Sequence, residues 1–242
     1  MRKSFAVLAL LLSCVSLNVS AYESQARDEE LKEELFKVIS KNHRSLGYNS
    51  AKKSLFGKLH LEQSTRGYFI KDLYCGKLFT QGVGPGSLPN QNELNCEHTW
   101  PQSKFTPAFS KEMQKSDLHH LFPTDSKANS TRGNYEFADV VRNENLVNCE
   151  LSQSGASTTQ GGHTFFEPPT FHKGNVARAL FYFSVRYKMS INPSQEAFLR
   201  QWNEIDPVDQ EEINRNDAIE KLQGNRNPFI DNPELINQIS DF

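Results

Sequence analysis

Helical sequence patterns occupy the two ends of this chain, and its long middle segment has none. Apolar residues recur at helical spacing over residues 24–45 and again over residues 175–189. Residues 66–174 hold most of the glycine and histidine residues and show no sustained period, and the polar segments 80–95 and 151–164 within them are predicted loops. We therefore expect a mixed domain in which helices pack around a small irregular centre that carries the chemistry.

Capping residues mark the expected helix ends. Gly47 can end the first helix, because glycine readily adopts the left-handed conformation that closes a helix. Ser194 can cap a third helix, and Asp206-Pro207 matches the N-cap and first position of a fourth. Gly224 is expected to close that last helix. These helices are expected to serve as the scaffold.

Residues 1–21 have the features of a secretory signal peptide. Arg2 and Lys3 precede an apolar run, and a small-residue motif ends at Ala21, where we expect cleavage. The apolar run is too short to span a bilayer, and no other stretch approaches that length. We expect export to the periplasm or the medium. In the alternative interpretation, "LLSC" resembles a lipobox and Cys14 is lipidated.

The charge balance excludes one class of nucleic-acid-binding protein. The formal net charge of the whole chain is −2, and loss of the signal peptide removes two basic residues and no acidic residue. Proteins that bind nucleic acid through a global field are usually basic. Any contact of this chain with a polyanion must therefore depend on a local patch or a bound cation.

Cysteine usage allows one disulfide in the exported chain. Cleavage leaves Cys75, Cys96 and Cys149, and no CxxC motif is present. We expect one bridge and one free thiol, because three cysteines cannot all pair within one chain. The sequence leaves open which two cysteines pair.

Two central stretches are dense in side chains that can take part in chemistry. They are NCEHTWPQSKF at residues 95–105 and DLHHLFPTDSKANSTRGNYEF at residues 117–137. SDLHHLF alternates loosely and predicts a short strand, for which the first stretch can be the partner. Thr124 or Asp125 can then cap a short helix that Gly133 closes. The expected local structure is two strands followed by a helix.

Candidate reactive residues lie on these elements. Asn129 and Arg132 are three residues apart on the short helix and therefore share a face. Glu97 and His98 are adjacent on a strand and point to opposite faces. Both reach one site only if a twist, a bulge or the strand end re-aims one of them. Taken alone, His98 is more often a structural histidine than a catalytic one.

Two further alternatives concern neighbouring residues. His119 and His120 are candidate zinc ligands together with Cys96 and His98, but adjacent histidines on a strand point apart and the chain lacks a typical zinc-ligand spacing. Trp100 fits a core position better than a platform for stacking bases.

Four separated blocks now point to a family. They are CEHTWPQSKF, DLHHLFPTDSKANSTRGNYEF, FEPPTFHKGNVARALFYFSVRYKM and KLQGNRNPFI, and in this order they resemble the endonuclease I family of secreted and periplasmic non-specific bacterial nucleases. The resemblance extends from about Tyr74 to Ile230. It implies an α+β fold in which a ββα-metal nuclease finger is embedded in a mainly helical single domain, here residues 22–242.

The resemblance also implies residue roles. His98 matches the general base that activates water, and Glu97 and Asn129 match the two protein ligands of one Mg²⁺ or Mn²⁺ ion. Asp117 and His119 match a supporting block. The residue types suit this chemistry, because a neutral histidine can accept a proton near pH 7 and Mg²⁺ prefers a few oxygen ligands together with water.

One departure from the family concerns the cation that neutralises the phosphate. Family members often carry a longer insertion with an arginine between the first two blocks, whereas residues 105–116 are short and, with Lys104, offer only lysines. We expect Arg132, Lys127 and Lys104 to contact the substrate backbone.

The expected function is that of an exported, metal-dependent endonuclease. It should act as a monomer on DNA, with RNA as a second substrate, with little sequence preference and with no small-molecule cofactor. The alternative is a non-catalytic exported protein that keeps the fold and binds metal or nucleic acid.

Overall fold

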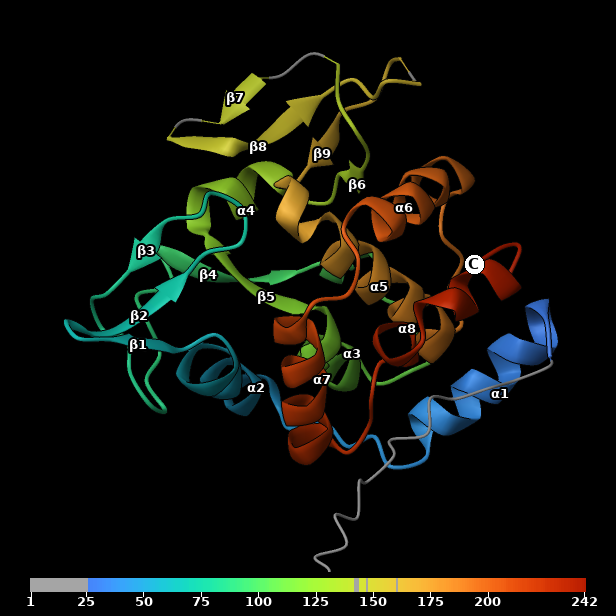
Figure 1. Cartoon of the computed structure of the whole chain (residues 1–242), viewed down its shortest axis with the longest axis horizontal. Helices are drawn as coiled ribbons and strands as arrows, with labels where there is room; N and C mark the ends of the chain where they lie inside the picture. The colour runs from blue at the N-terminus through green and yellow to red at the C-terminus, as the bar shows by residue number, and fades with distance from the viewer. Residues whose placement is uncertain (1–25, 142–143, 147, 160) are drawn as a thin grey trace, which may run out of the picture.

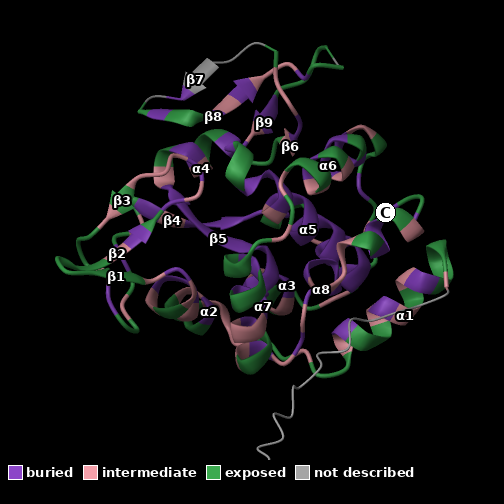
Figure 2. Cartoon of the chain, in the orientation of Figure 1, coloured by how far each residue is buried: buried purple, intermediate pink, exposed green. Residues whose placement is uncertain are grey.

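One long helix, α5 (Thr170–Tyr187), is buried on nearly every side and forms the centre of the structure (Figure 1). From His172 to Tyr187 only Asn175 is not classed as buried, and the helix is largely purple in Figure 2. The computed structural model of the chain describes residues 26–141, 144–146, 148–159 and 161–242. A helix that is buried all round belongs to a core, so the remaining elements are arranged around α5.

Other helices cover α5. α1 (Asp28–Ser40), α6 (Pro193–Ile205) and the short α8 (Pro228–Asp231) pack directly against it. α7 (Gln210–Gln223) and the 3₁₀ helix η4 (Pro233–Gln238) contact α8. The apolar stripes predicted from the sequence face the core, since the buried residues include Leu31, Leu35, Ile39, Phe198, Leu199 and Trp202. The helical scaffold expected at the chain ends is therefore confirmed.

The end of the first helix differs from the prediction. α1 ends well before Gly47, because the backbone N–H of Arg44 donates to the carbonyl of Gln223 (2.9 Å) and the chain turns toward the C-terminal helices. Gly47, with φ of 73°, instead precedes the next helix. Gly224 closes α7 as predicted, with φ of 90°. A Cβ at Gly224 would lie 2.3 Å from a backbone oxygen, so only glycine fits there.

Two helices begin at caps other than the predicted ones. Asn192, not Ser194, caps α6 by accepting the backbone N–H of Ser194 (3.0 Å). Asp209, not Asp206, caps α7 by accepting the N–H of Glu212 (2.8 Å). In both places the neighbouring polar residues are all good caps, and packing of the helix decided between them.

Two small sheets flank the central helix. The first is antiparallel and contains β1 (Glu62–Ser64), β2 (Gly67–Lys71) and β3 (Leu78–Phe79); α2 (Tyr48–Ser54) and the π-helix η1 (Leu55–Leu59) precede it in the chain. The second has the order β6-β9-β8-β7, formed by β6 (Glu136–Phe137), β9 (Phe165–Glu167), β8 (Cys149–Gly155) and β7 (Glu144–Leu146). The predicted loop at 151–164 is therefore wrong for residues 151–155, which pair with both neighbouring strands.

The two reactive stretches form the predicted strand pair and helix. β4 (Leu94–His98) pairs antiparallel with β5 (Leu121–Asp125), and α4 (Ser126–Arg132) follows directly. Asp125 caps α4 by accepting the N–H groups of Lys127 (2.9 Å) and Ala128 (3.0 Å), and Gly133 follows the helix at φ of 54°. The ββα finger and the α+β fold are confirmed.

The connection between the two strands is more helical than expected. It contains the 3₁₀ helix η2 (Gln102–Lys104), α3 (Lys111–Ser116) and the 3₁₀ helix η3 (Leu118–His120). Only part of SDLHHLF is strand, because Asp117 accepts the N–H of His119 (3.1 Å) and caps η3. The strand accordingly begins at Leu121.

A disulfide ties the connection between β2 and β3 to the first residue of β8 in the second sheet. Cys75 pairs with Cys149 across 74 residues of sequence, and Cys96 is a free, buried thiol. This outcome confirms one bridge and one free thiol among the three cysteines and settles the pair that the sequence left open. Cys14 and the rest of the predicted signal peptide, residues 1–21, lie outside the described residues.

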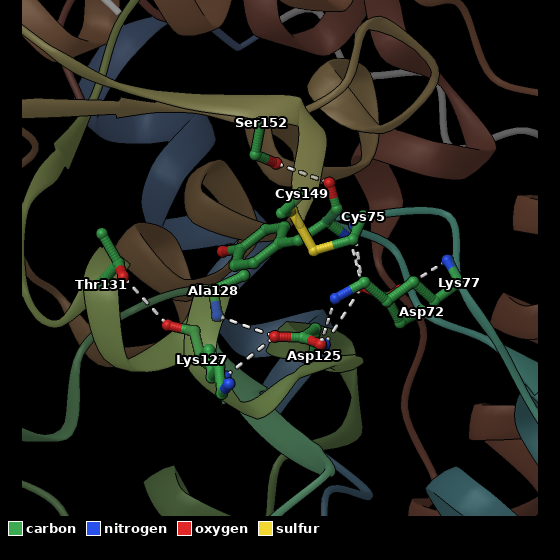
Figure 3. The surroundings of a disulfide bond; sticks show 10 residues. Asp72, Cys75, Lys77, Asp125, Lys127, Ala128, Thr131, Cys149 and Ser152 are labelled. Carbon is green, nitrogen blue, oxygen red and sulfur yellow. Dashed lines mark hydrogen bonds and ion pairs between the residues drawn. A yellow bond between two sulfur atoms is a disulfide. The ribbon is translucent and has the colours of Figure 1, made fainter. Parts of the chain in front are cut away.

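Hydrogen bonds beside the disulfide hold the start of α4 (Figure 3). One carboxylate oxygen of Asp72 accepts the N–H groups of Cys75 (2.8 Å) and Asp125 (3.1 Å). Asp125 in turn pairs with Lys77 at 2.8 Å. The bridged segment and the cap of α4 therefore form one connected unit, and this unit positions the helix that carries Asn129.

Removal of this disulfide should weaken the whole fold. A Cys75→Ser/Cys149→Ser double variant is expected to lose about 2–4 kcal/mol of unfolding free energy, because the unfolded chain gains the freedom that a long closed loop denies it. Urea denaturation followed by circular dichroism measures the loss. Reductant should bring the wild type to the same midpoint and leave the double variant unchanged; equal midpoints for wild type and variant without reductant would contradict the prediction.

Among the described residues, no helix is both long enough and apolar enough to cross a membrane.

Candidate active site

An open cleft of about 460 Å³ lies where the end of β4 meets α4. Its lining includes Glu97, His98, Asn129, Arg132, Tyr48 and Gln102. Four residues that the sequence singled out for catalysis, metal binding or substrate binding are thus brought to one cavity. Glu97 and His98 lie on β4, and Asn129 and Arg132 lie on α4. The β4–β5–α4 arrangement therefore creates the site.

Glu97 and His98 reach the same cleft although they are neighbours on a strand. His98 is the last residue of β4, where it pairs with Leu121, the first residue of β5. Beyond this pair one further bond, from the N–H of Thr99 to the carbonyl oxygen of His120 (3.0 Å), joins the two segments, and the chain then enters η2 at Gln102. The sequence required a twist, a bulge or a strand end to bring both side chains to one site, and the strand end satisfies this requirement.

The His98 ring is held in one tautomer. Its Nε2 lies 3.1 Å from the carbonyl oxygen of Lys115, which can only accept a hydrogen bond, so Nε2 carries the proton. Nδ1 is therefore the atom with the free lone pair, and the side-chain amide of Gln102 lies 3.3 Å from it. Burial holds the pKa of His98 well below its usual range, and nearby His120 lowers it further, while the hydrogen bond to the Lys115 carbonyl acts in the opposite direction. The ring is neutral at pH 7 and can accept a proton at Nδ1.

Glu97 is buried and balanced by two donors. Its Oε1 accepts from Nη1 of Arg132 (2.7 Å) and from the hydroxyl of Tyr74 (3.0 Å). Burial raises the pKa of Glu97, while the Arg132 charge and the Tyr74 hydrogen bond act in the opposite direction. Both side-chain donors on Glu97 converge on Oε1, so Oε2 carries neither of these two hydrogen bonds.

Asn129 supplies a second oxygen donor to the cleft. It lies on α4 and is half-buried. A carboxylate and an amide carbonyl are hard oxygen ligands, and an open cleft leaves room for the water molecules that complete a Mg²⁺ shell. Within the described segments, no group of three or more His, Cys, Asp and Glu side chains is placed to hold a metal ion. The residues present therefore fit a sparse, water-rich site for a hard divalent cation.

Comparison with known proteins gives the family. The Endonuclease I family profile matches residues 28–234, nearly all of the described chain. The chain belongs to the Endonuclease I family. It is similar to an extracellular ribonuclease of Bacillus subtilis (32% identity over 229 residues, 87% of this chain and 74% of the relative) and to a periplasmic deoxyribonuclease of Aeromonas hydrophila (32% over 142 residues, 58% and 57%). An endonuclease-1 of Buchnera aphidicola is 27% identical over 136 residues, 56% of this chain and 51% of the relative. The protein is a nuclease, as the sequence predicted.

Arg132 has a different environment from the one expected of an Endonuclease I phosphate ligand. It is 2% exposed, and besides Glu97 it donates to the carbonyl oxygens of His98 (2.9 Å) and Thr99 (2.6 Å). Its guanidinium carbon lies 4.4 Å from the ring centre of Phe137. Arg132 lines the cleft, yet most of its hydrogen-bonding capacity holds the end of β4 in place.

The two lysines predicted to bind substrate do not line the cleft. Lys104 donates to Glu136 at 3.4 Å and lies beside a separate, smaller cavity. Lys127 is exposed on α4. Neither lysine therefore lies in the cleft with His98.

Asp117 and His119 lie outside the cleft in a buried network. Asp117 accepts from the hydroxyls of Tyr182 (2.8 Å) and Tyr187 (2.9 Å) and from the amide of Gln223 (2.8 Å). Nε2 of His119 lies 3.1 Å from the carbonyl oxygen of Asn225. Burial lowers the pKa of His119 to about 3, so this ring is neutral. The network fastens η3 to α5 and to the turn after α7, and through η3 it fixes the start of β5.

Several residues at the cleft were missed by the sequence interpretation. Tyr74 supports Glu97, Gln102 covers Nδ1 of His98, and Tyr48 packs its ring 5.4 Å from the His98 ring. Lys115 holds the ring through its backbone carbonyl. Gln102 lies in the same short stretch as His98, whereas Tyr48, Tyr74 and Lys115 come from separate segments that no local spacing links to it. Trp100, in contrast, is a core residue as expected, stacked 5.1 Å from Phe183.

A larger cavity of about 510 Å³ lies elsewhere, between η1 and the first turns of α5 and α7. It is lined by the buried His60, His172 and Arg215, with the carboxylates of Glu62, Asp209 and Glu211. These carboxylates oppose binding of a polyanion. The smaller cleft at β4 and α4 is therefore the better candidate for nuclease chemistry.

Proposed function

We propose that this protein is an exported, metal-dependent endonuclease that hydrolyses phosphodiester bonds of DNA, and of RNA as a second substrate, with little sequence preference. The observation that carries the proposal is the convergence of Glu97, His98 and Asn129 on one open cleft. A base, two oxygen donors and room for water are the groups that metal-assisted phosphodiester hydrolysis needs.

In this mechanism, His98 and the two oxygen donors have separate tasks. Nδ1 of neutral His98 accepts the proton of the attacking water, while Nε2 stays bonded to the Lys115 carbonyl and keeps the ring oriented. Gln102 must release Nδ1 when water binds there. Glu97 and Asn129 would hold a divalent cation, which when bound neutralises phosphate charge and stabilises the leaving oxygen. Arg132 and Tyr74 keep Glu97 oriented through Oε1.

The breadth of substrate is proposed from the relatives and from the kind of contact expected of the site. Relatives named extracellular ribonuclease and relatives named deoxyribonuclease both resemble this chain. Phosphates are common to DNA and RNA of every sequence, and contacts to phosphates position a protein without specifying bases. We therefore expect cleavage of both polymers, biased at most by groove shape and by the 2′-hydroxyl.

The proposed location follows from the N-terminal segment and the relatives. Residues 1–21 are proposed as a cleaved signal peptide, and residues 22–242 as a single nuclease domain that acts as a monomer. Relatives are named extracellular or periplasmic. Intact-mass measurement of the mature protein decides between a chain that starts near Tyr22 and a lipoprotein that starts at an acylated Cys14.

Metal removal tests the proposed function. Purified protein should nick and linearise supercoiled plasmid in Mg²⁺ or Mn²⁺. EDTA should reduce the rate to background, because the cation held by the two protein ligands supplies the charge that stabilises the leaving oxygen. Addition of Mg²⁺ in excess of the chelator should restore the activity. Asn129→Ala should need a higher Mg²⁺ concentration than wild type.

The alternative function predicts the opposite result in the same assay. A non-catalytic binding protein retards plasmid or RNA in a gel and leaves it uncut at every metal concentration. Cutting at full rate in EDTA would instead support the nuclease activity and contradict the metal dependence. Parallel reactions on duplex DNA, single-stranded DNA and RNA measure the substrate range.

A further inference from the structure

Lys115 has two groups at the active site, although the sequence gave it no role beyond being one of few lysines. Its backbone carbonyl accepts the Nε2–H of His98 at 3.1 Å. Its ammonium group lies over the ring of Tyr48, 4.3 Å from the ring centre, and Tyr48 lies beside His98 with the ring centres 5.4 Å apart. This hydrogen bond to the Lys115 backbone holds the His98 ring, so the Lys115 side chain begins next to His98.

Tyr48 connects the cleft to a second cavity. Tyr48 lines both the catalytic cleft and an adjoining open cavity of about 380 Å³, which Lys115 also lines. A second ammonium group, that of Lys52, lies 4.8 Å from the centre of the same ring. Two ammonium groups therefore contact one aromatic ring that lines both cavities, and Lys115 also lines the second of them.

These two lysines are not neutralised within the protein. Neither Lys52 nor Lys115 forms an ion pair within 4 Å in the described part of the chain. Of the three residues expected to bind phosphate, Arg132 pairs with Glu97 and Lys104 with Glu136. Lys127, the third, does not line the cleft. One carboxylate, Glu112, lines the adjoining cavity, and its Oε1 accepts the backbone N–H of Tyr48 at 2.5 Å.

We propose that Lys115 and Lys52 form a phosphate-binding subsite on the Tyr48 side of the cleft, which takes a backbone phosphodiester of the nucleic acid whose neighbouring bond lies at His98. This inference rests on the proposed nuclease function. It assigns the cation that the short segment 105–116 left open. In a protein with a negative formal charge, two unpaired ammonium groups beside the base supply the local positive field that a polyanion requires.

The test uses single lysine variants of the full chain. Lys115→Ala should raise KM for duplex DNA several-fold and change kcat much less, because the lost contact holds substrate and is not at the reacting bond. In the non-cutting His98→Ala background, the same change should make the slope of log affinity against log salt shallower by about one unit. Lys52→Ala should do the same, and the double variant should lose about two units. Lys115→Arg should restore most of the KM and the slope.

Lys111→Ala is the matched control. Lys111 lies on the same helix, is exposed and lines neither cavity, so its removal changes the net charge equally without touching the subsite. If Lys115→Ala and Lys52→Ala behave like Lys111→Ala in KM and salt slope while the wild type cuts normally, the subsite is refuted and the nuclease function stands. A loss of kcat alone that Lys115→Arg does not restore would also refute it, since it would show damage to the His98 contact. A wild type that never cuts would reject the proposed function itself.

Discussion

His98→Ala should lose about 10²–10⁴-fold in the rate of phosphodiester hydrolysis while binding substrate nearly normally, the usual loss when a general base is removed. The structure ties the expectation to one atom. Nε2 donates to the Lys115 carbonyl, so Nδ1 alone can accept the proton of water. Single-turnover cleavage of a labelled duplex in saturating Mg²⁺ measures the rate, and binding is measured separately by fluorescence anisotropy. A variant with near-normal turnover would remove His98 from the mechanism.

The matched control and the pH dependence sharpen this test. His163→Ala removes an exposed histidine far from the finger in sequence and should leave the rate unchanged. The pKa of His98 lies below its usual value of 6.5, because burial opposes protonation and His120 reinforces the effect, which the hydrogen bond to the Lys115 carbonyl offsets only in part. The base is therefore still neutral at pH 6.5, and the wild-type rate should fall only at more acidic pH. A rate that halves near pH 6.5 would point to an unburied histidine or to a different base.

Arg132→Ala should lower the unfolding free energy by about 3–5 kcal/mol, the usual cost of leaving a buried charge without its partner. Glu97 and Arg132 are each 2% exposed, and the arginine also satisfies the carbonyls of His98 and Thr99. Its removal strands a carboxylate and two backbone acceptors at the end of β4. Urea denaturation measures the change, and we expect weaker Mg²⁺ binding as well, because Glu97 loses a group that orients it.

Two comparisons separate this structural role from the phosphate contact predicted from the sequence. Lys104→Ala breaks a partly exposed pair with Glu136 and should cost less than about 1 kcal/mol. The double variant Glu97→Gln/Arg132→Met removes both buried charges and should recover much of the stability. If Arg132→Ala keeps the wild-type denaturation midpoint and only makes the salt dependence of binding shallower, Arg132 is a phosphate ligand and not a support for Glu97.

Sequence reasoning identified the finger well because its signals are local. Asp125 and Gly133 directly precede and follow α4, and capping chemistry of this short range can be recognised in a sequence. Glu97 and His98 lie on the first strand of the ββα finger and Asn129 on its helix, and the order strand, strand, helix is what defines this motif. The same local logic misplaced the starts of α6 and α7, since several good capping residues occur within a few positions and only packing chose Asn192 and Asp209.

The sequence by itself therefore determined the family, the order of the elements in the finger and the three residues that meet in the cleft. Only the tertiary structure decided the partner of each side chain. Arg132 points inward because the buried Glu97 carboxylate is stable only with a charged partner, which Arg132 supplies. The bond between Cys75 and Cys149, the contact of Tyr74 with Glu97 and the position of Lys115 beside His98 join segments far apart in sequence. Contacts of this kind arise from packing of the whole chain around α5, and no local pattern encodes them.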